Sequence, residues 1–172
     1  EYKQAREQTS PRVEGMLAAG EQLAQLDAAT RNATDPYLLL WHWTNNTNEL
    51  ARQQFLALEG QPVLEEPELQ LALGGIYAKS EPQKAIALMQ HALSLYREGD
   101  QVNGRILTSL STLYMGQKQY GQAYLWGKVS ESFQNAAEVS ATRFSLYHSL
   151  SKQEQESLDS QAATLVEQLK SG

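Results

Sequence analysis

Residues 72–93 read ALGGIYAKSEPQKAIALMQHAL, and the spacing of large and small residues in this stretch occurs three times in the chain. The middle copy has spacings of 4, 8, 4 and 3 at Leu73, Tyr77, Ala85, Met89 and Ala92. The same spacings occur 34 residues upstream at Leu39, Trp43, Ala51, Phe55 and Leu58. The downstream copy has spacings of 4, 9, 4 and 3 at Leu110, Tyr114, Ala123, Gly127 and Ser130. Self-similarity at this period predicts an array of helical repeats.

Each copy has the pattern of two short helices that pack against each other. The large residue lies four positions after a Leu, so the two share one face of the first helix. A small residue follows at Ala51, Ala85 or Ala123, where a larger side chain would overpack the crossing of the second helix with the first. Because one hairpin cannot bury its apolar face alone, we expect the copies to stack around a continuous core.

The middle copy resembles the tetratricopeptide (TPR) repeat. The resemblance lies in Ala-Leu-Gly-Gly-Ile-Tyr at 72–77, Lys84-Ala85-Ile86 and His91-Ala92-Leu93. It implies an all-α fold, an αα-hairpin repeat array that forms a right-handed superhelix. The other copies depart from the repeat, since Leu40 and Ser111 replace its Gly and Gly127 replaces its bulky residue.

At 172 residues, one helical-repeat domain over residues 1–172 is the expected organisation. Its predicted parts are an N-terminal helix at 10–33, repeat hairpins at 35–60, 67–99 and 103–134, and a C-terminal capping pair at 136–170. Pro after a capping residue predicts several of the helix starts. Gly15 and Gly20 lie inside the first helix, so we expect close packing against a neighbour there. A turn is expected at 44–47, and Ser151 with Glu154 forms a predicted capping box.

A second resemblance covers Asp35 to Trp126. It rests on Asp35-Pro36, His42-Trp43, QFLALEG at 54–60, EPELQ at 66–70 and Lys118-Gln119-Tyr120. This segment is similar to a family of uncharacterised bacterial envelope lipoproteins known only as a domain of unknown function. The resemblance implies a periplasm-facing place in the bacterial cell envelope, with the cytoplasm as the alternative. Because the sequence begins at Glu1 rather than at a start Met, we expect an upstream targeting signal or lipid anchor.

Composition excludes several classes of function. The net charge is −6 and no basic stripe is present, which argues against nucleic-acid binding. No run approaches the roughly 20 apolar residues that a membrane span needs. The absence of Cys excludes disulfides, zinc-thiolate sites and thiol catalysis.

Motifs for catalysis or metal binding are near misses. Residues 121–130 resemble a phosphate-binding loop, but five residues separate the two Gly where four are needed. Ser149 and Lys152 match a Ser-x-x-Lys motif whose companion motifs are missing. His42, His91 and His148 have no carboxylate or His at metal-ligand helical spacing. We therefore assign no catalytic residue, no metal and no cofactor, and we expect a protein that is not an enzyme.

The TPR resemblance implies a ligand in a concave groove that is lined by the first helix of each hairpin. The matching positions are Tyr37, Trp41, Thr44, Asn45, Leu71, Gly75, Lys79, Arg105, Thr108 and Thr112. Their mixture of aromatic, small and polar groups suits an extended peptide or a partner helix. The expected function is a non-enzymatic protein–protein interaction scaffold whose partner is an unknown protein or peptide. The alternative is an enzymatic or small-molecule-binding domain whose site is assembled only by the fold. The oligomeric state does not follow from the sequence.

Aromatic residues lead to three further expectations. Trp41 is the best anchor for a partner, because its repeat equivalents are Gly75 and Thr112, although packing against the N-terminal helix is nearly as good an account. Trp43 and Tyr77 should occupy equivalent, largely buried positions. Tyr120, Tyr124 and Trp126 are interpreted as helix core rather than as a platform for an aromatic ligand.

Overall fold

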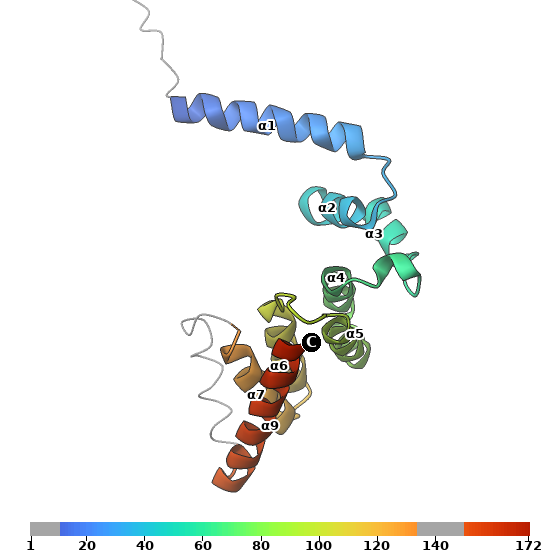
Figure 1. The fold of residues 1–172 in the computed structure, drawn as a ribbon. Coiled ribbons are helices and arrows are strands. Elements are labelled where there is room, and N and C mark those ends of the chain that lie inside the picture. Colours follow the sequence, from blue (N-terminus) through green and yellow to red (C-terminus); the bar gives the residue numbers. More distant parts are fainter. Residues whose placement is uncertain (1–10, 134–149) are drawn as a thin grey trace, which may run out of the picture. The chain divides into compact units, whose positions relative to one another are not determined.

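A computed structural model describes residues 11–133 and 150–172 of the chain. These residues form eight α-helices and one 3-10 helix, and they contain no strand, which confirms the predicted all-α class. The chain divides into two compact units, Glu1–Ala57 and Leu58–Gly172, and each is described here by itself (Figure 1). The single repeat domain therefore stays a prediction.

Unit 1 contains α1 (Pro11–Thr30), α2 (Pro36–Asn46) and α3 (Glu49–Leu56). The Asp35 carboxylate caps α2 by accepting hydrogen bonds from the backbone N–H groups of Tyr37 and Leu38, at 3.0 and 3.1 Å. The turn predicted at 44–47 is wrong, because α2 continues to Asn46. The left-handed residue that ends α2 is Thr47, with φ of 49°, so only two residues separate α2 from α3.

The core of unit 1 is small. Leu39, Ala51 and Phe55, three positions of the repeated pattern, are buried as α2 packs against α3. In contrast, α1 has no buried residue. Apart from the glycine's own chain neighbours and the nearby backbone of α1, no atom of the described residues lies within 4 Å of a Cβ built on Gly15 or Gly20, so the expected close packing against a neighbour is wrong. The physical reason is that α1 contacts its unit through polar side chains of its last turn.

Unit 2 contains the remaining described helices. They are η1 (Pro62–Leu64), α4 (Pro67–Tyr77), α5 (Pro82–Ser94), α6 (Gly104–Gly116), α7 (Tyr120–Glu131) and α9 (Lys152–Ser171). The capping box at the start of α9 is confirmed, since Ser151 and Glu154 bond each other's backbone N–H groups. The first helix of the predicted C-terminal pair falls largely on residues 134–149, outside the described part.

Neighbouring helices of unit 2 share one apolar core. α4 packs against α5, α5 against α6, α6 against α7, and α7 against α9. The buried side chains in this core come from α5, α6, α7 and α9, together with Val102. The two hairpins α4–α5 and α6–α7 are therefore joined through α5 and α6.

The two hairpins of unit 2 have equivalent crossings with exchanged side-chain volume. In the first, a Cβ at Gly74 would lie 2.8 Å from the Met89 terminal methyl group and 3.4 Å from the Ala85 carbonyl oxygen. In the second, Ser111 stands where Gly74 stands, and its hydroxyl donates to the Ala123 carbonyl oxygen at 2.7 Å. A Cβ on Gly127, the equivalent of Met89, would lie 3.4 Å from that hydroxyl oxygen.

Two aromatic positions of the pattern have the same degree of burial. Trp43 and Tyr77 are both mostly covered, as predicted, and their equivalent Tyr114 is buried. Polar groups contact both partly covered rings. The Tyr77 hydroxyl donates to Glu59, and the Arg52 guanidinium lies 5.8 Å from the Trp43 ring centroid.

The crossing at Gly74 should tolerate no branched side chain. We expect Gly74→Val to lower the free energy of unfolding by about 1–3 kcal/mol, because Met89 fills the space that Val would need. Gly75→Val is the matched control, since nothing lies within 4 Å of a Cβ there, and its effect should stay within about 0.5 kcal/mol. Urea denaturation measures both, and equal losses would contradict the crossing described here.

Candidate functional site

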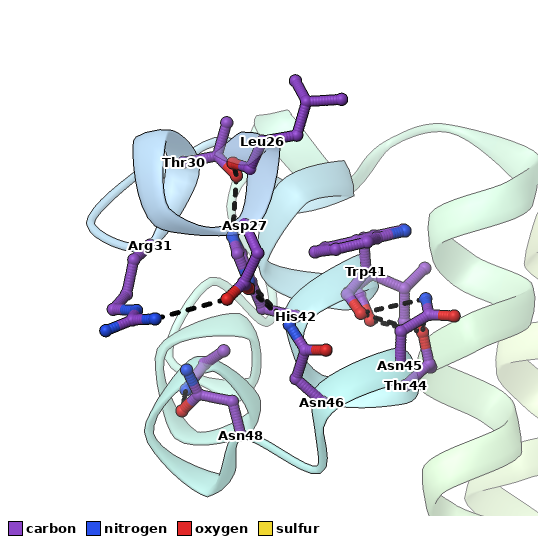
Figure 2. Close-up of polar contacts among 12 residues, drawn as sticks. Leu26, Asp27, Thr30, Arg31, Trp41, His42, Thr44, Asn45, Asn46 and Asn48 are labelled. Carbon is purple, nitrogen blue, oxygen red and sulfur yellow. Dashed lines mark hydrogen bonds and ion pairs between the residues drawn. The ribbon is translucent and has the colours of Figure 1, made fainter. Parts of the chain in front are cut away.

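A buried histidine links α1 to α2 in unit 1. His42 is 1% exposed. Its Nδ1 lies 3.0 Å from the Asp27 carboxylate oxygen Oδ1, and its Nε2 lies 3.0 Å from the Thr30 hydroxyl oxygen (Figure 2). Both ring nitrogens therefore have hydrogen-bond partners on the last turns of α1.

Further side chains surround this histidine (Figure 2). The second Asp27 oxygen lies 3.3 Å from the Arg31 guanidinium, and the Asn46 amide donates to the first. The Trp41 ring meets the His42 ring edge-on, with the centroids 5.0 Å apart. Asp27 is thus bonded by Arg31, which directly follows α1, and by His42 and Asn46 of α2, so the cluster connects the end of α1 to α2.

An acid, a histidine and a hydroxyl in series also occur in hydrolases that activate a nucleophile. Here the Thr30 hydroxyl donates to the Leu26 carbonyl oxygen of its own helix at 2.7 Å. The hydroxyl proton is therefore directed at the backbone rather than at the imidazole. This geometry favours a structural fastening over a nucleophile.

A second series of the same kind occurs in unit 2. The Glu65 carboxylate lies 2.6 Å from His91 Nε2, and the Ser94 hydroxyl oxygen lies 3.4 Å from His91 Nδ1. The Ser94 hydroxyl donates to the His91 carbonyl oxygen at 2.7 Å, so its proton is also engaged by the backbone. The His91 side chain is 44% exposed, so this pair is a surface ion pair of low strength.

A third cluster joins the start of unit 2 to its first hairpin. Glu59 accepts a hydrogen bond from the Tyr77 hydroxyl at 2.6 Å and pairs with the Lys84 ammonium at 2.7 Å. Lys84 also lies 3.6 Å from the Tyr77 ring centroid. Burial raises the pKa of Glu59, but the bonds from Lys84 and Tyr77 and the Lys84 charge lower it below its usual 4.5. The hydrogen bond to Glu59 raises the pKa of Lys84.

The described residues contain neither a cluster of metal-binding side chains nor a helix that could span a membrane. No three His, Cys, Asp or Glu side chains are grouped to hold a metal ion in residues 11–133 and 150–172. No helix in the same ranges has the length and apolar character to cross a membrane. His148 lies outside the described residues.

The groove residues predicted from the sequence fall in both units. Tyr37, Trp41, Thr44 and Asn45 lie on α2 in unit 1. Leu71 and Gly75 lie on α4, Lys79 follows its end, and Arg105, Thr108 and Thr112 lie on α6. All are at least partly exposed. A shared groove stays a prediction.

On α2, the predicted groove residues are partly engaged by their own helix (Figure 2). The Thr44 hydroxyl donates to the Leu40 carbonyl oxygen at 2.8 Å, and the Asn45 amide donates to the Trp41 carbonyl oxygen at 3.1 Å. Trp41 is partly exposed and contacts the His42 ring. The exposed part of its ring, together with the more exposed Tyr37, is therefore available to meet a partner.

Sequence reasoning missed the partners of His42. Asp27 and Thr30 precede it by 15 and 12 residues and lie on another helix, so helical spacing within α2 could not reveal them. The available signal was the polar His42 within the apolar run from Tyr37 to Trp43. A buried His needs hydrogen-bond partners, but the sequence does not say which residues supply them.

The fold and these clusters define an all-helical protein of consecutive hairpins within the described ranges. A family model described as "Protein of unknown function (DUF2989)" matches residues 1–128, and the chain belongs to this family. No curated protein and no solved structure matches the chain.

The His42 cluster should contribute more stability than the exposed His91 pair. We expect His42→Leu to lower the free energy of unfolding by about 1–3 kcal/mol, because it removes the bonds from a buried imidazole to Asp27 and Thr30 that connect α2 to α1. His91→Leu is the matched control and should cost less than about 1 kcal/mol. Urea denaturation gives the free energy of unfolding of each variant, and hydrogen exchange of the α2 amides follows local opening. A larger loss of stability for His91→Leu than for His42→Leu would contradict this prediction.

The Glu59 cluster should make stability depend on pH. Because the folded state lowers the pKa of Glu59, its contribution is present above the usual 4.5 and is lost as pH falls through the lower folded value. Glu59→Gln should therefore be less stable than the parent at pH 7, and this difference should shrink toward pH 3. Tyr77→Phe removes the hydrogen bond from the Tyr77 hydroxyl to Glu59. In that background, the stability difference between Glu59→Gln and its parent at pH 7 should be smaller. A difference that grows on acidification would contradict the cluster.

Proposed function

We propose that the protein is a non-enzymatic interaction scaffold of TPR-like hairpins, which binds an extended peptide or partner helix on the exposed face of a hairpin's first helix. The observation that carries this proposal is the repeated crossing, in which Gly74 and Ser111 occupy equivalent places beside Met89 and Gly127. Helical repeats of this kind present extended surfaces for partners.

The chemistry of α4 and α6 supports a peptide ligand. Gly75 and Thr112 are exposed and small, which lets a backbone approach the helix surface closely. Leu71 is partly buried against the apolar core and offers an apolar contact. Lys79 and Arg105 add exposed cations that can pair with carboxylates of a ligand. Shape with a few anchors is sufficient for binding, whereas catalysis needs an activated group.

The alternative is an enzyme that uses one of the two acid–histidine–hydroxyl series. Both hydroxyl groups donate to backbone carbonyl oxygens, which supports the scaffold over this alternative. Hydrolysis of 4-nitrophenyl acetate that is lost in both Thr30→Val and His42→Gln, with the fold retained, would instead support an enzyme.

We also propose a place in the bacterial cell envelope, attached by a lipid anchor upstream of Glu1. This rests on the resemblance of residues 35–126 to envelope lipoproteins. Fractionation of the native full-length protein tests it, and recovery in the cytosolic fraction would contradict it.

Charge reversal on α6 should abolish partner capture. We expect the double variant Arg105→Glu and Thr112→Glu to capture at least tenfold less partner than the parent chain, when each is cross-linked in envelope extract. The control is Lys152→Glu with Thr164→Glu, which makes the same charge change at exposed positions of α9. Quantitative mass spectrometry reads both, and equal capture by the two variants would refute a site on α6.

Trp41 tests the surface on α2. Its ring is partly exposed, so Trp41→Ala should change the free energy of unfolding by less than about 2 kcal/mol while partner capture falls. Denaturation and capture are measured on the same preparation. A loss of several kcal/mol would assign Trp41 to the core, and unchanged stability with unchanged capture would end its assignment as an anchor.

A further inference from the structure

The large apolar side chains of α1 are exposed. α1 is one uninterrupted helix, and none of its residues is buried (Figure 1). Four of its apolar side chains are between 54 and 68% exposed, namely Met16, Leu17, Leu23 and Leu26. Contiguous exposed apolar patches are uncommon on monomeric proteins, and the larger ones are often contact surfaces. The apolar side of α1 is therefore a candidate interface.

This apolar side continues the surface through which α1 contacts α2. Alternating steps of four and three residues place five positions along one side of the helix, namely Met16, Gly20, Leu23, Asp27 and Thr30. We call these five positions the α1 seam. Its last two residues contact His42 of α2. The seam thus meets a helix at its C-terminal end, and it offers apolar side chains of the same alignment further toward its N-terminus.

The exposed part of the seam suits a second copy of itself. Leu17 and Leu23 lie three residues before and after Gly20, and Met16 and Ala24 lie four residues before and after it. Two copies of α1 that cross in antiparallel orientation at Gly20 would place each Leu17 opposite Leu23 of the other copy. Each Met16 would meet the small Ala24, which avoids overpacking. Such a contact uses the same patch on both copies, as a two-fold dimer interface does.

The space at Gly20 permits this crossing. Apart from the glycine's chain neighbours and the nearby backbone of α1, no atom of the described residues lies within 4 Å of a Cβ built on Gly20. A second helix can therefore approach closely at this position.

Charge and area also fit a pair of α1 helices. Glu21 is the only charged residue from Gly15 to Leu26. It is turned about 100° around the helix from Gly20, so the crossing buries no charge of the seam. The four large apolar side chains of each copy would together bury on the order of 1,000 Å², which is the lower bound for a specific interface.

We propose that α1 binds α1 of a second copy of this chain, in an antiparallel pair centred on Gly20. The pair closes as a two-fold dimer. Its interface uses none of the residues assigned to the proposed peptide surface, so the two proposals are tested separately.

The first test is the association of the full chain, measured by sedimentation equilibrium. We expect a concentration-dependent dimer, and Leu17→Glu with Leu23→Glu should weaken its association at least tenfold. The matched control is Ala18→Glu with Gln25→Glu, which makes the same charge change at exposed positions on the other side of α1 and should associate like the parent. A parent chain that stays monomeric up to about 0.1 mM would overturn the proposal. So would equal association of the two double variants.

A second test uses single cysteines, because the chain has no Cys of its own. Gly20→Cys should form an intermolecular disulfide on mild oxidation, since the two Gly20 face each other. Met16→Cys should not, because in the antiparallel pair its two copies are offset by about 12 Å along the helix axis, beyond the reach of a disulfide. Gln22→Cys, on the other side of α1, is the background control, and circular dichroism verifies that each variant is folded.

The cross-linking result distinguishes the arrangements. Cross-linking of Gly20→Cys that exceeds both other variants supports the antiparallel pair. Equal cross-linking of Met16→Cys and Gly20→Cys would indicate a parallel pair and overturn the proposal. Cross-linking of Gly20→Cys no stronger than that of Gln22→Cys would overturn the interface itself.

Discussion

The close approach of two helices at a residue without a side chain is the constraint on which unit 2 depends. Where α4 crosses α5, Gly74 leaves space that the Met89 side chain occupies. Where α6 crosses α7, the larger group has moved to the first helix as Ser111, and Gly127 leaves the space. Both crossings keep a buried Ala at the same neighbouring place, Ala85 or Ala123, where the second helix approaches the first.

This exchange explains why spacing predicted the hairpins better than residue identity did. Ser111 and Gly127 are departures from the TPR pattern when each is compared alone, but they compensate as a pair across the crossing. The buried Ala85 and Ala123 were predictable because a small residue at a helix crossing has one physical use. The polar partners of Trp43 and Tyr77, which are Arg52 and Glu59, were not predictable, because the spacing of the pattern does not reveal them.

The candidate sites were less predictable than the helices, since each depends on residues of different elements. His42 obtains its partners from α1, and Glu59 bonds to Tyr77 of α4 and Lys84 of α5. Hydrogen-bonded clusters in both units connect segments at helix ends, which is a structural use of titratable groups.

The most direct measurement of the central claim is a double-mutant cycle that transfers the Gly74–Met89 arrangement to α6 and α7. Gly127→Met alone should lower the free energy of unfolding by about 1–3 kcal/mol, because Ser111 occupies the space. Adding Ser111→Gly should recover stability and give a favourable coupling energy of about 1 kcal/mol or more. Additive losses, with no recovery in the double variant, would contradict the claim that the two crossings are equivalent.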